Sequence, residues 1–361
     1  MQGDFQIVKR KAAGRYRKWG IDRKLPSLPT QAIVPLDETD TVLLLTSRYP
    51  PGFQYEAYVA ELAYANALAE AARGFAVTED PSGVFDKTVI WFIPDKTFVF
   101  PRLWDYSRQV YQFALGMESQ DNRPLCSADE TLFWENKAHM HRRLAEIGAP
   151  TPRTEILTAE GWQSSRFDLE PALIKEEHSA GSGGIHHFQT AAEARRFVSE
   201  YPFRPTESLI MQEIVPGATK DLRLTMAGDR IVEAATYWRV KSPEVLAGPE
   251  WTTTATSYNS LVVHGDIPSE IGSLAAKWLQ GLGIRTAGVD LMWTDDDISK
   301  DPQILELSPY YQPNPPKPER YADWTYREYK GKRRNIPQGY RLEQFDAYQT
   351  IARDLLAQDL I

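Results

Sequence analysis

The chain has 361 residues, of which 42% are hydrophobic and 25% charged, and its formal net charge at pH 7 is -8. This composition is typical of an ordinary globular protein, and the length predicts two or three packed units. The negative charge argues against general nucleic-acid binding, and no apolar run approaches the ~18 residues that suggest a membrane span.

The first 35 residues form a basic arm without clear periodicity. We expect residues 1–35 to be a solvated tail or a strap across another domain, with a transit peptide and a nucleic-acid contact as alternatives. No signal-peptide apolar segment follows the start. Cys126 is the one cysteine, so the chain cannot form an internal disulfide, and a reducing, cytoplasmic location is expected.

Residues 36–126 alternate between strand and helix patterns. Apolar runs of strand length cover 41–46 and 88–93, and helical spacing of apolar residues covers 58–72 and 104–117. This alternation predicts a small parallel sheet with helices on its faces. No G-x-G-x-x-G motif follows any of these strands, so a dinucleotide-binding fingerprint is absent.

The next unit, 127–205, begins with a helix signal. Ser127 and Glu130 form a capping-box pattern, which predicts a helix that continues to about Ile147. Lys137 lies toward the apolar stripe of this helix. It either meets an anionic partner there or extends from the edge of the stripe to water.

A short apolar strand then leads into a loop of small residues. Ala172–Ile174 is the strand, and Lys175 stands at its end. Small residues let backbone N–H groups approach phosphate oxygens, and a lysine adds a point charge, so the stretch is typical of a polyphosphate site. The alternative is a mobile surface loop beside a solvated lysine. The loop residues that carry the first interpretation are Ser179, Gly181, Ser182, Gly183 and Gly184.

Strand patterns dominate 206–318. On Asp221–Met226 the residues alternate, so Asp221 and Arg223 share one face and Leu222 and Leu224 the other. Arg239 and Lys241 likewise share a face. The expected strands are 208–213, 221–226, 230–240, 286–293 and 303–308, and residues 319–361 are expected to form a polar loop and a last amphipathic helix.

Two carboxylates lie in strands that are expected to be neighbours. Asp290 is in the middle of one strand, and Glu306 alternates with Leu305 and Leu307 in the next. A carboxylate inside a sheet is costly unless it is paired or bound to a metal, and oxygen ligands suit Mg2+. A metal together with several cations around a phosphate chain is the arrangement used for phosphoryl transfer. The alternative is a pair of surface charges on a hairpin.

In this order, the motifs from about Leu125 to Pro313 resemble the ATP-grasp superfamily of carboxylate–amine ligases. The resemblance implies a two-lobed nucleotide site within a mixed α/β (α+β) fold, preceded by a small parallel α/β domain. It also implies that Lys137 and Lys175, with the small-residue loop, contact ATP. The hinge that would read the adenine edge corresponds to Gln212, Glu213 and Ile214.

The remaining motifs imply the other site residues. Asp221 corresponds to an acid near the ribose, and Arg223 to an arginine near the phosphates or the acyl substrate, as in the glutamate-adding branch. Asp290, Glu306 and Ser308 correspond to the Mg2+ ligands, although Ser308 replaces the usual asparagine. Gly288 stands where D-alanine–D-alanine ligases have an arginine, so that branch is disfavoured.

The resemblance implies an ADP-forming ligase with ATP and Mg2+ as cofactors. Its substrates would be a small carboxylic acid and an amine, with amino acids and peptides among the candidates and neither nucleic acid nor membrane as a partner. Arg223, Arg239 and Lys241 would stabilise charge during formation of an acyl phosphate. A homodimer is compatible with the resemblance. The rival functions are a small-molecule kinase and a nucleotide-binding protein without turnover.

Overall fold

The computed structural model describes residues 25–48, 55–93, 103–133, 136–179, 183–248, 260–263, 265–309 and 337–361, together with Trp251, Thr253 and Pro313. Within these ranges no helix is long and apolar enough to cross a membrane. Most of the basic arm, residues 1–24, lies outside the described residues, so its predicted role stays a prediction. The predicted domain boundaries also stay predictions.

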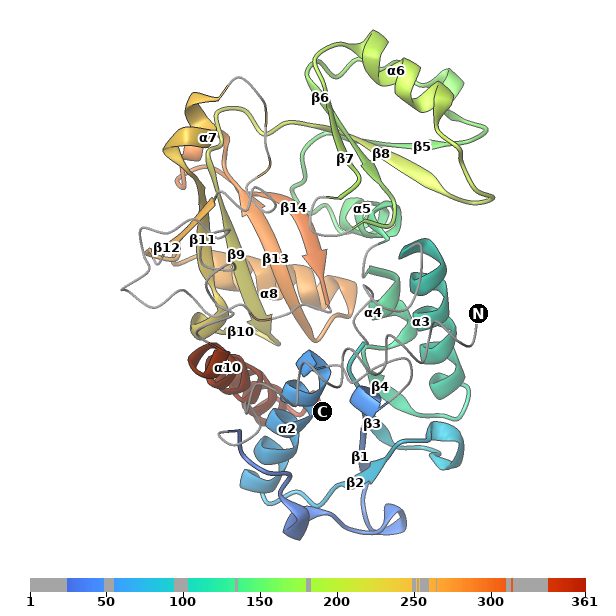
Figure 1. The fold of residues 1–361 in the computed structure, drawn as a ribbon, viewed down its shortest axis with the longest axis vertical. Helices are drawn as coiled ribbons and strands as arrows, with labels where there is room; N and C mark the ends of the chain where they lie inside the picture. The colour runs from blue at the N-terminus through green and yellow to red at the C-terminus, as the bar shows by residue number, and fades with distance from the viewer. Residues whose placement is uncertain are drawn as a thin grey trace.

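The first unit is a four-stranded parallel sheet in the order β2-β1-β3-β4, at the bottom of Figure 1. Alternate residues of β1 face opposite cores: Leu43 packs with α2, whereas Val42 and Leu44 pack with α3. The predicted parallel sheet with a helix on each face is therefore confirmed. The elements are β1 (Thr41–Leu44), α2 (Tyr55–Glu70), β2 (Ala76–Thr78), β3 (Thr88–Ile90), α3 (Leu103–Glu118) and β4 (Arg123–Leu125).

The helix predicted to run without a break to Ile147 is in fact two helices, α4 (Ala128–Phe133) and α5 (Lys137–Glu146). The capping box at its start is present, since Ser127 and Glu130 each donate a backbone N–H to the other's side chain, at 2.7 and 3.1 Å. The second helix begins because the Asn136 side chain accepts a hydrogen bond from the backbone N–H of His139 at 2.9 Å. Lys137 consequently occupies the first turn of α5.

The central lobe is an antiparallel sheet in the order β5-β8-β6-β7, covered on one face by α6 (Ala191–Glu200). Thr190 and Glu193 form the capping box that starts α6. This lobe lies at the top of Figure 1. Its strands are β5 (Thr154–Thr158), β6 (Ala172–Glu176), β7 (Ile185–Phe188) and β8 (Ser208–Glu213).

The C-terminal lobe is a larger sheet in the order β12-β11-β9-β13-β14, with β10 paired to β9. Helices α5 and α8 pack on the face that carries Leu222 and Leu224, as the alternation on this strand predicted. The elements are β9 (Lys220–Ala227), β10 (Arg230–Ile231), β11 (Tyr237–Lys241), α7 (Pro243–Ala247), β12 (Ser260–Val263), α8 (Ile271–Leu282), β13 (Thr286–Met292) and β14 (Gln303–Ser308). Together with the other sheets they confirm the mixed α/β fold class.

The single strand predicted over 230–240 is interrupted by a short 3-10 helix, Glu233–Ala235. Side-chain hydrogen bonds support the interruption: the hydroxyl of Thr236 donates to the carbonyl of Val232 at 3.0 Å, and that of Thr225 to Ala235 at 2.8 Å. Such local bonds offer the backbone an alternative to the sheet ladder. Arg239 and Lys241 therefore belong to a separate strand, β11.

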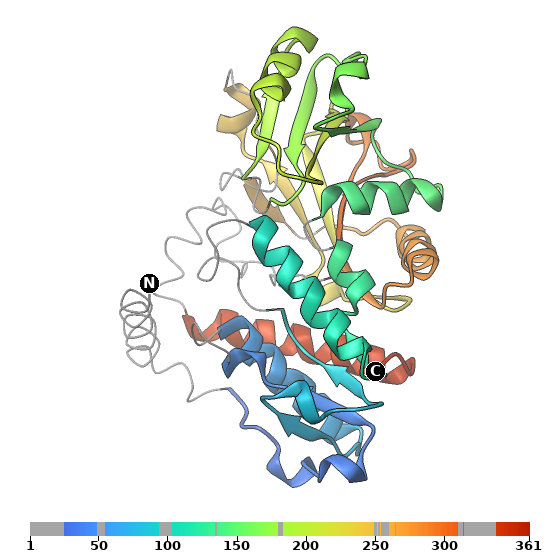
Figure 2. The same cartoon turned by 90° about the vertical axis from the view of Figure 1, so that its right-hand side faces the viewer.

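The last helix, α10 (Pro337–Ala357), returns to the first unit. Figures 1 and 2 show it lying along α2, and its residues Phe345, Ile351 and Leu355 share a core with Val59 and other residues of α2. A surface ion pair at 2.7 Å between Arg353 and Glu70 adds to this contact. The helix is thus a packing element, as its amphipathic pattern predicted.

Candidate active site

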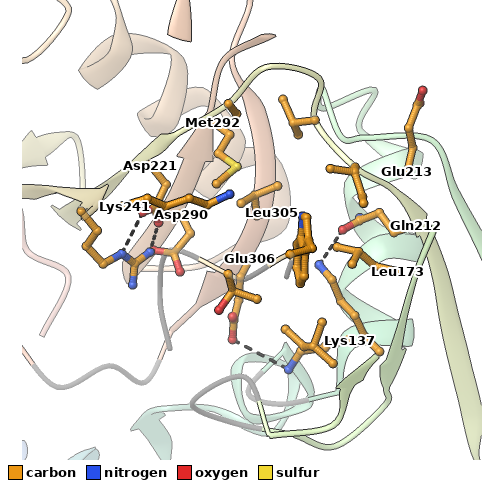
Figure 3. A pocket seen from close by; sticks show the side chains of 18 of the residues that line it. Lys137, Leu173, Gln212, Glu213, Asp221, Lys241, Asp290, Met292, Leu305 and Glu306 are labelled. Carbon is orange, nitrogen blue, oxygen red and sulfur yellow. Dashed lines mark hydrogen bonds and ion pairs between the residues drawn. The ribbon is translucent and has the colours of Figure 1, made fainter. Parts of the chain in front are cut away.

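A cavity of about 240 Å³ lies between the central and C-terminal lobes. Figure 3 shows Leu173 and Gln212 on one side of it, and Asp221, Lys241 and Asp290 on the other. It brings together most of the residues that the sequence predicted for a nucleotide site. Those that line it are Lys137, Lys175, Ser179, Gln212, Glu213, Ile214, Asp221, Arg223, Arg239, Lys241, Asp290 and Glu306.

Two buried lysines enter this cavity from different elements. Lys137, at the start of α5, donates from Nζ to the backbone carbonyl of Ser179 at 2.7 Å. Lys175, at the end of β6, donates to the side-chain oxygen of Gln212. Burial, reinforced by the positive charge of Lys137, lowers the pKa of Lys175 to about 8. Two buried cations in one cavity create a strong preference for an anionic ligand.

The predicted hinge residues differ in what they offer to a ligand. Gln212 is buried and its side chain is engaged by Lys175 and by the hydroxyl of Thr154, to which it donates at 2.9 Å. The backbone N–H of Glu213 donates to the carbonyl of Arg153 at 2.9 Å. Ile214 lies just beyond the end of β8 and lines the cavity. Recognition of a base by this segment stays a prediction.

Acids and arginines alternate across three neighbouring strands. In the register of the sheet, Arg239 of β11 lies opposite Asp221 of β9, and Arg223 of β9 lies opposite Asp290 of β13. Arg223 binds both oxygens of Asp290, one of them at 2.8 Å, and Arg239 reaches the same carboxylate at 2.8 Å. Arg239 also binds Asp221. The four side chains form one buried network without net formal charge.

The network fixes the charge state of Asp290. Burial opposes ionisation of this carboxyl group, but Arg223 and Arg239 outweigh burial and hold its pKa below the ordinary value. Burial opposes the charge of the two arginines as well, but Asp290 raises the pKa of Arg223, and Asp221 and Asp290 raise the pKa of Arg239. The carboxylate therefore stays ionised while it is buried, and it holds two guanidinium groups at the wall of the cavity.

Asp290 and Glu306 lie directly opposite each other in the pairing of β13 with β14. The Glu306 side chain is 38% exposed, with the Nζ of Lys137 at 4.0 Å, whereas Asp290 is occupied by its arginines. No group of three or more His, Cys, Asp or Glu side chains suited to a metal occurs in the described parts of the chain. The Glu306 carboxylate leaves room for the water and substrate ligands that Mg2+ usually keeps, whereas both oxygens of Asp290 are bound by arginines.

Ser308 does not line the cavity, although it follows Glu306 by two residues in β14. It pairs in the sheet with Gly288. Its role as a metal ligand stays a prediction.

The prediction that Leu305 points away from Glu306 is wrong, because both residues line the cavity. The pairing register shifts here: Asp290 pairs with Glu306, but Leu291 pairs with Ile304. This shift is a β-bulge, which leaves Leu305 unpaired and turns it toward the cavity. Leu307 remains in the core, as predicted.

Of the small-residue loop, Ser179, Gly183 and Gly184 are described, whereas Gly181 and Ser182 lie outside the described residues. Gly184 has a positive φ of 76°, and a Cβ there would lie 3.0 Å from side-chain atoms of Glu176 and Ser179. A glycine is therefore required where the chain re-enters the sheet. Ser179 and its carbonyl remain at the cavity wall beside Lys137.

The cavity has walls that the sequence analysis did not assign. Leu173, Ile185 and Met292 line it, and the two-residue spacing of Leu173 from Lys175 is the signal that could have found the first of them. Trp251, for which the sequence left lining a pocket and simple packing as alternatives, lines the cavity as well. Its ring stacks on His187 at 5.0 Å, and the Nζ of Lys241 lies 5.8 Å from its centroid. His178 precedes Ser179 in the sequence but does not line this cavity; it lines a second one.

Comparisons with known proteins give structural matches of low sequence identity. No protein-family model matches the sequence, and no curated protein matches it either. Among solved structures, the chain is similar to the ATP-grasp ligase PsnB complexed with a minimal precursor, with 13% identity, 76% of this chain and 91% of that chain covered, and a TM-score of 0.47. It is similar to the D-cycloserine synthetase DcsG with 15% identity, coverage of 86% and 99%, and a TM-score of 0.48. It is also similar to D-alanine–D-alanine ligase from Bacillus anthracis complexed with ATP, with 9% identity, coverage of 88% and 98%, and a TM-score of 0.49.

Proposed function

We propose that this protein is an ATP-grasp ligase, which uses ATP to join a carboxylate to an amine and releases ADP and phosphate. The observation that carries the proposal is the convergence of Lys137 and Lys175 with Asp290 and Glu306 on one cavity between two sheets. Buried cations on one side and carboxylates on the other complement a nucleotide triphosphate with its metal ion.

The two lysines would bind the phosphate chain. Lys175 is buried at the cavity wall, and within the described residues its ammonium donates a hydrogen bond to the neutral amide of Gln212, so its charge is available to a phosphate oxygen. The ammonium of Lys137 lies 4.0 Å from the Glu306 carboxylate and 2.7 Å from the Ser179 carbonyl oxygen. These two contacts hold it at the cavity wall. The apolar walls would take the base, as in most nucleotide pockets. These walls are formed by Leu173, Ile185, Met292 and Leu305.

Mg2+ would be held by Glu306, and Asp290 would join it by exchanging an arginine contact for the ion. Ser308, which lies outside the cavity lining, would act through a water molecule. When bound, Mg2+ supplies neutralisation of charge on the phosphate oxygens. Arg223 and Arg239 present planar guanidinium groups whose orientation is set by Asp290 and Asp221. They would bind and orient the substrate carboxylate, because such groups recognise carboxylates in a bidentate manner. Lys241 would add a further positive charge at this wall.

The reaction would proceed in two balanced steps. A carboxylate oxygen attacks the γ-phosphorus of ATP and the bond to the β-phosphate oxygen breaks, which gives an acyl phosphate and ADP. The amine then attacks the acyl carbon, phosphate leaves, and the amine loses a proton. The residues contribute position and charge stabilisation rather than a strong base. Exclusion of water would protect the acyl phosphate between the two steps.

A coupled ADP-release screen over carboxylic acids and amines, amino acids and short peptides included, tests this proposal. We expect ADP and free phosphate in equal amounts, and only when both an acid and an amine are present. ADP without free phosphate would instead identify a kinase. Tight ATP binding with no turnover for any pair would identify a nucleotide-binding protein that lacks catalysis.

The pKa of Lys175 predicts a pH dependence. Because this pKa is about 8 in the free protein, kcat/KM for ATP should fall as the pH rises through about 8, where the ammonium becomes neutral. The ordinary pKa of a lysine is 10.5. Between about pH 8 and 10.5 the unfolded chain therefore binds more protons at Lys175 than the folded protein, and the free energy of unfolding should rise with pH. Rate profiles and urea unfolding between about pH 7 and 10 measure both effects. Lys175→Arg, which stays charged, should remove the fall, and a flat wild-type profile would contradict the assignment.

A further inference from the structure

A second cavity, of about 340 Å³, lies where the first unit meets the central lobe. Its lining comes from α3 on one side, and from Asn136, Glu177 and His178 on the other. In the sequence, Glu177 and His178 lie between Lys175 and Ser179, and Lys175 and Ser179 both line the first cavity. The two cavities therefore share one short segment of chain but have different walls.

Two buried polar atoms in this lining have no hydrogen-bond partner in the part of the chain that the structure describes. They are the hydroxyl of Ser107 and the Nδ1 of His178. Ser107 is 7% exposed, and the His178 side chain is also 7% exposed. Burial, with the charges of Lys137 and Arg204, lowers the pKa of His178 to about 3, so its ring is neutral. Orphaned buried polar atoms are uncommon in proteins and indicate a missing polar partner.

An acid lies beside these atoms. The Glu177 carboxylate is 6% exposed and accepts a hydrogen bond from the backbone N–H of Ser208 at 2.9 Å. Burial raises the pKa of this group to about 7. The neutral ring of His178 lies 3.9 Å from this carboxylate, and the side chain of Asn136 is hydrogen-bonded to it. A buried carboxylate in this setting is stabilised by a cationic ligand.

The opposite wall offers a cation and aromatic surface. Arg108 is exposed at the rim, with its guanidinium carbon 4.6 Å from the ring centroid of Trp104. Tyr111 lies one turn further along α3 and also lines the cavity. The lining of the cavity thus includes a negative group, a positive group and aromatic surface.

We infer that this second cavity binds a small zwitterion with the chemistry of a free α-amino acid. Its ammonium would lie against Glu177 and the Nδ1 of His178, and its carboxylate against Arg108 and the Ser107 hydroxyl. The side chain of the ligand would pack on Trp104 and Tyr111. This inference concerns binding alone and is independent of the proposed ligase reaction.

The test uses the full chain without nucleotide. Thermal unfolding is measured with each common amino acid, and the affinity of those that raise Tm is measured by calorimetry. Each such amino acid is compared with its N-acetyl and carboxamide derivatives, which lack one of the two charges. We expect at least one amino acid to bind and both of its derivatives to bind about tenfold more weakly or worse.

Three variants connect that binding to the cavity. Glu177→Gln keeps the acceptor for Ser208 but loses the charge, and Arg108→Gln loses the opposite charge. Each should weaken binding by about tenfold or more. Arg123→Gln is the matched control, because Arg123 is exposed in the same unit and lies outside the cavity. Its affinity should equal that of the wild type.

Failure to detect binding of any amino acid would overturn the inference, and so would unchanged binding in both Glu177→Gln and Arg108→Gln. Affinity for a non-hydrolysable ATP analogue is measured in parallel. Analogue binding without amino-acid binding would overturn this inference and leave the proposed function standing. Amino-acid binding that depends on Glu177 in a protein without affinity for the analogue would support this inference and contradict the proposed function.

Discussion

Replacement of Lys175 by methionine is expected to lower kcat/KM for ATP by about a hundredfold or more, the loss typical when one preorganised charge donor is removed. Lys175 is enclosed at the end of β6, beside Lys137 and Gln212. Methionine has a similar length but no charge, so it removes the interaction with phosphate and keeps the packing. The measurement is the ADP-release rate with the best acid and amine.

The same variant should remain folded. Loss of the hydrogen bond to buried Gln212 lowers stability by about 1–3 kcal/mol, whereas removal of a desolvated charge raises it. These effects oppose each other, so the change in the free energy of unfolding should be small. Lys300→Met is the control, because that side chain is about half exposed and pairs only with surface acids of its own turn. Full activity of Lys175→Met would refute the assignment of the phosphate site.

Asp290→Asn should lower the free energy of unfolding by about 3–5 kcal/mol, the range for breaking a buried ion pair from one side. The reason is that the neutral amide leaves the Arg223 guanidinium without its counter-charge, whereas Arg239 keeps Asp221 as a partner. Glu306→Gln is the matched comparison. Its side chain is 38% exposed, so its stability should change by about 0.5 kcal/mol or less. Urea unfolding measures both variants.

Both carboxylate variants should lose turnover, but for separable reasons. Addition of Arg223→Met to Asp290→Asn should restore part of the stability, since the cation that lost its partner is then removed. The difference between wild type and Asp290→Asn should also shrink in acid. The pKa of Asp290 lies below the ordinary 3.8, so its stabilising effect is full above that pH and is lost as the pH falls toward the lower folded value. Equal stability of Asp290→Asn and wild type at neutral pH would contradict the buried network.

Much of the fold could be predicted because strands and helices leave regular patterns. The alternation of Asp221 and Arg223 with Leu222 and Leu224 placed the polar face of β9 correctly, and Ser127 with Glu130 marked the start of α4. Strands β2 and β4 were not predicted, since three residues are too few to show a period. The break before α5 depends on one side-chain cap at Asn136, which competes with a continuous helix by a small energy.

The site could be predicted in its members but not in its contacts. The order of charged residues along the chain identified the residues that meet in the first cavity. Binding of both Arg223 and Arg239 to Asp290 depends on the register of three strands that are distant in sequence, and no local pattern encodes it. The inward turn of Leu305 depends on a bulge, which the sequence does not signal by a glycine.

The docking of α10 on α2 links folding to the direction of synthesis. The apolar face of α2 is completed by residues such as Ile351 and Leu355, which the ribosome adds long after α2 itself. At ordinary elongation rates this delay is on the order of tens of seconds. During that interval the face of α2 that α10 covers in the folded protein lacks this cover. Nascent-chain protection by chaperones, and sensitivity to truncation within α10, follow directly from this topology.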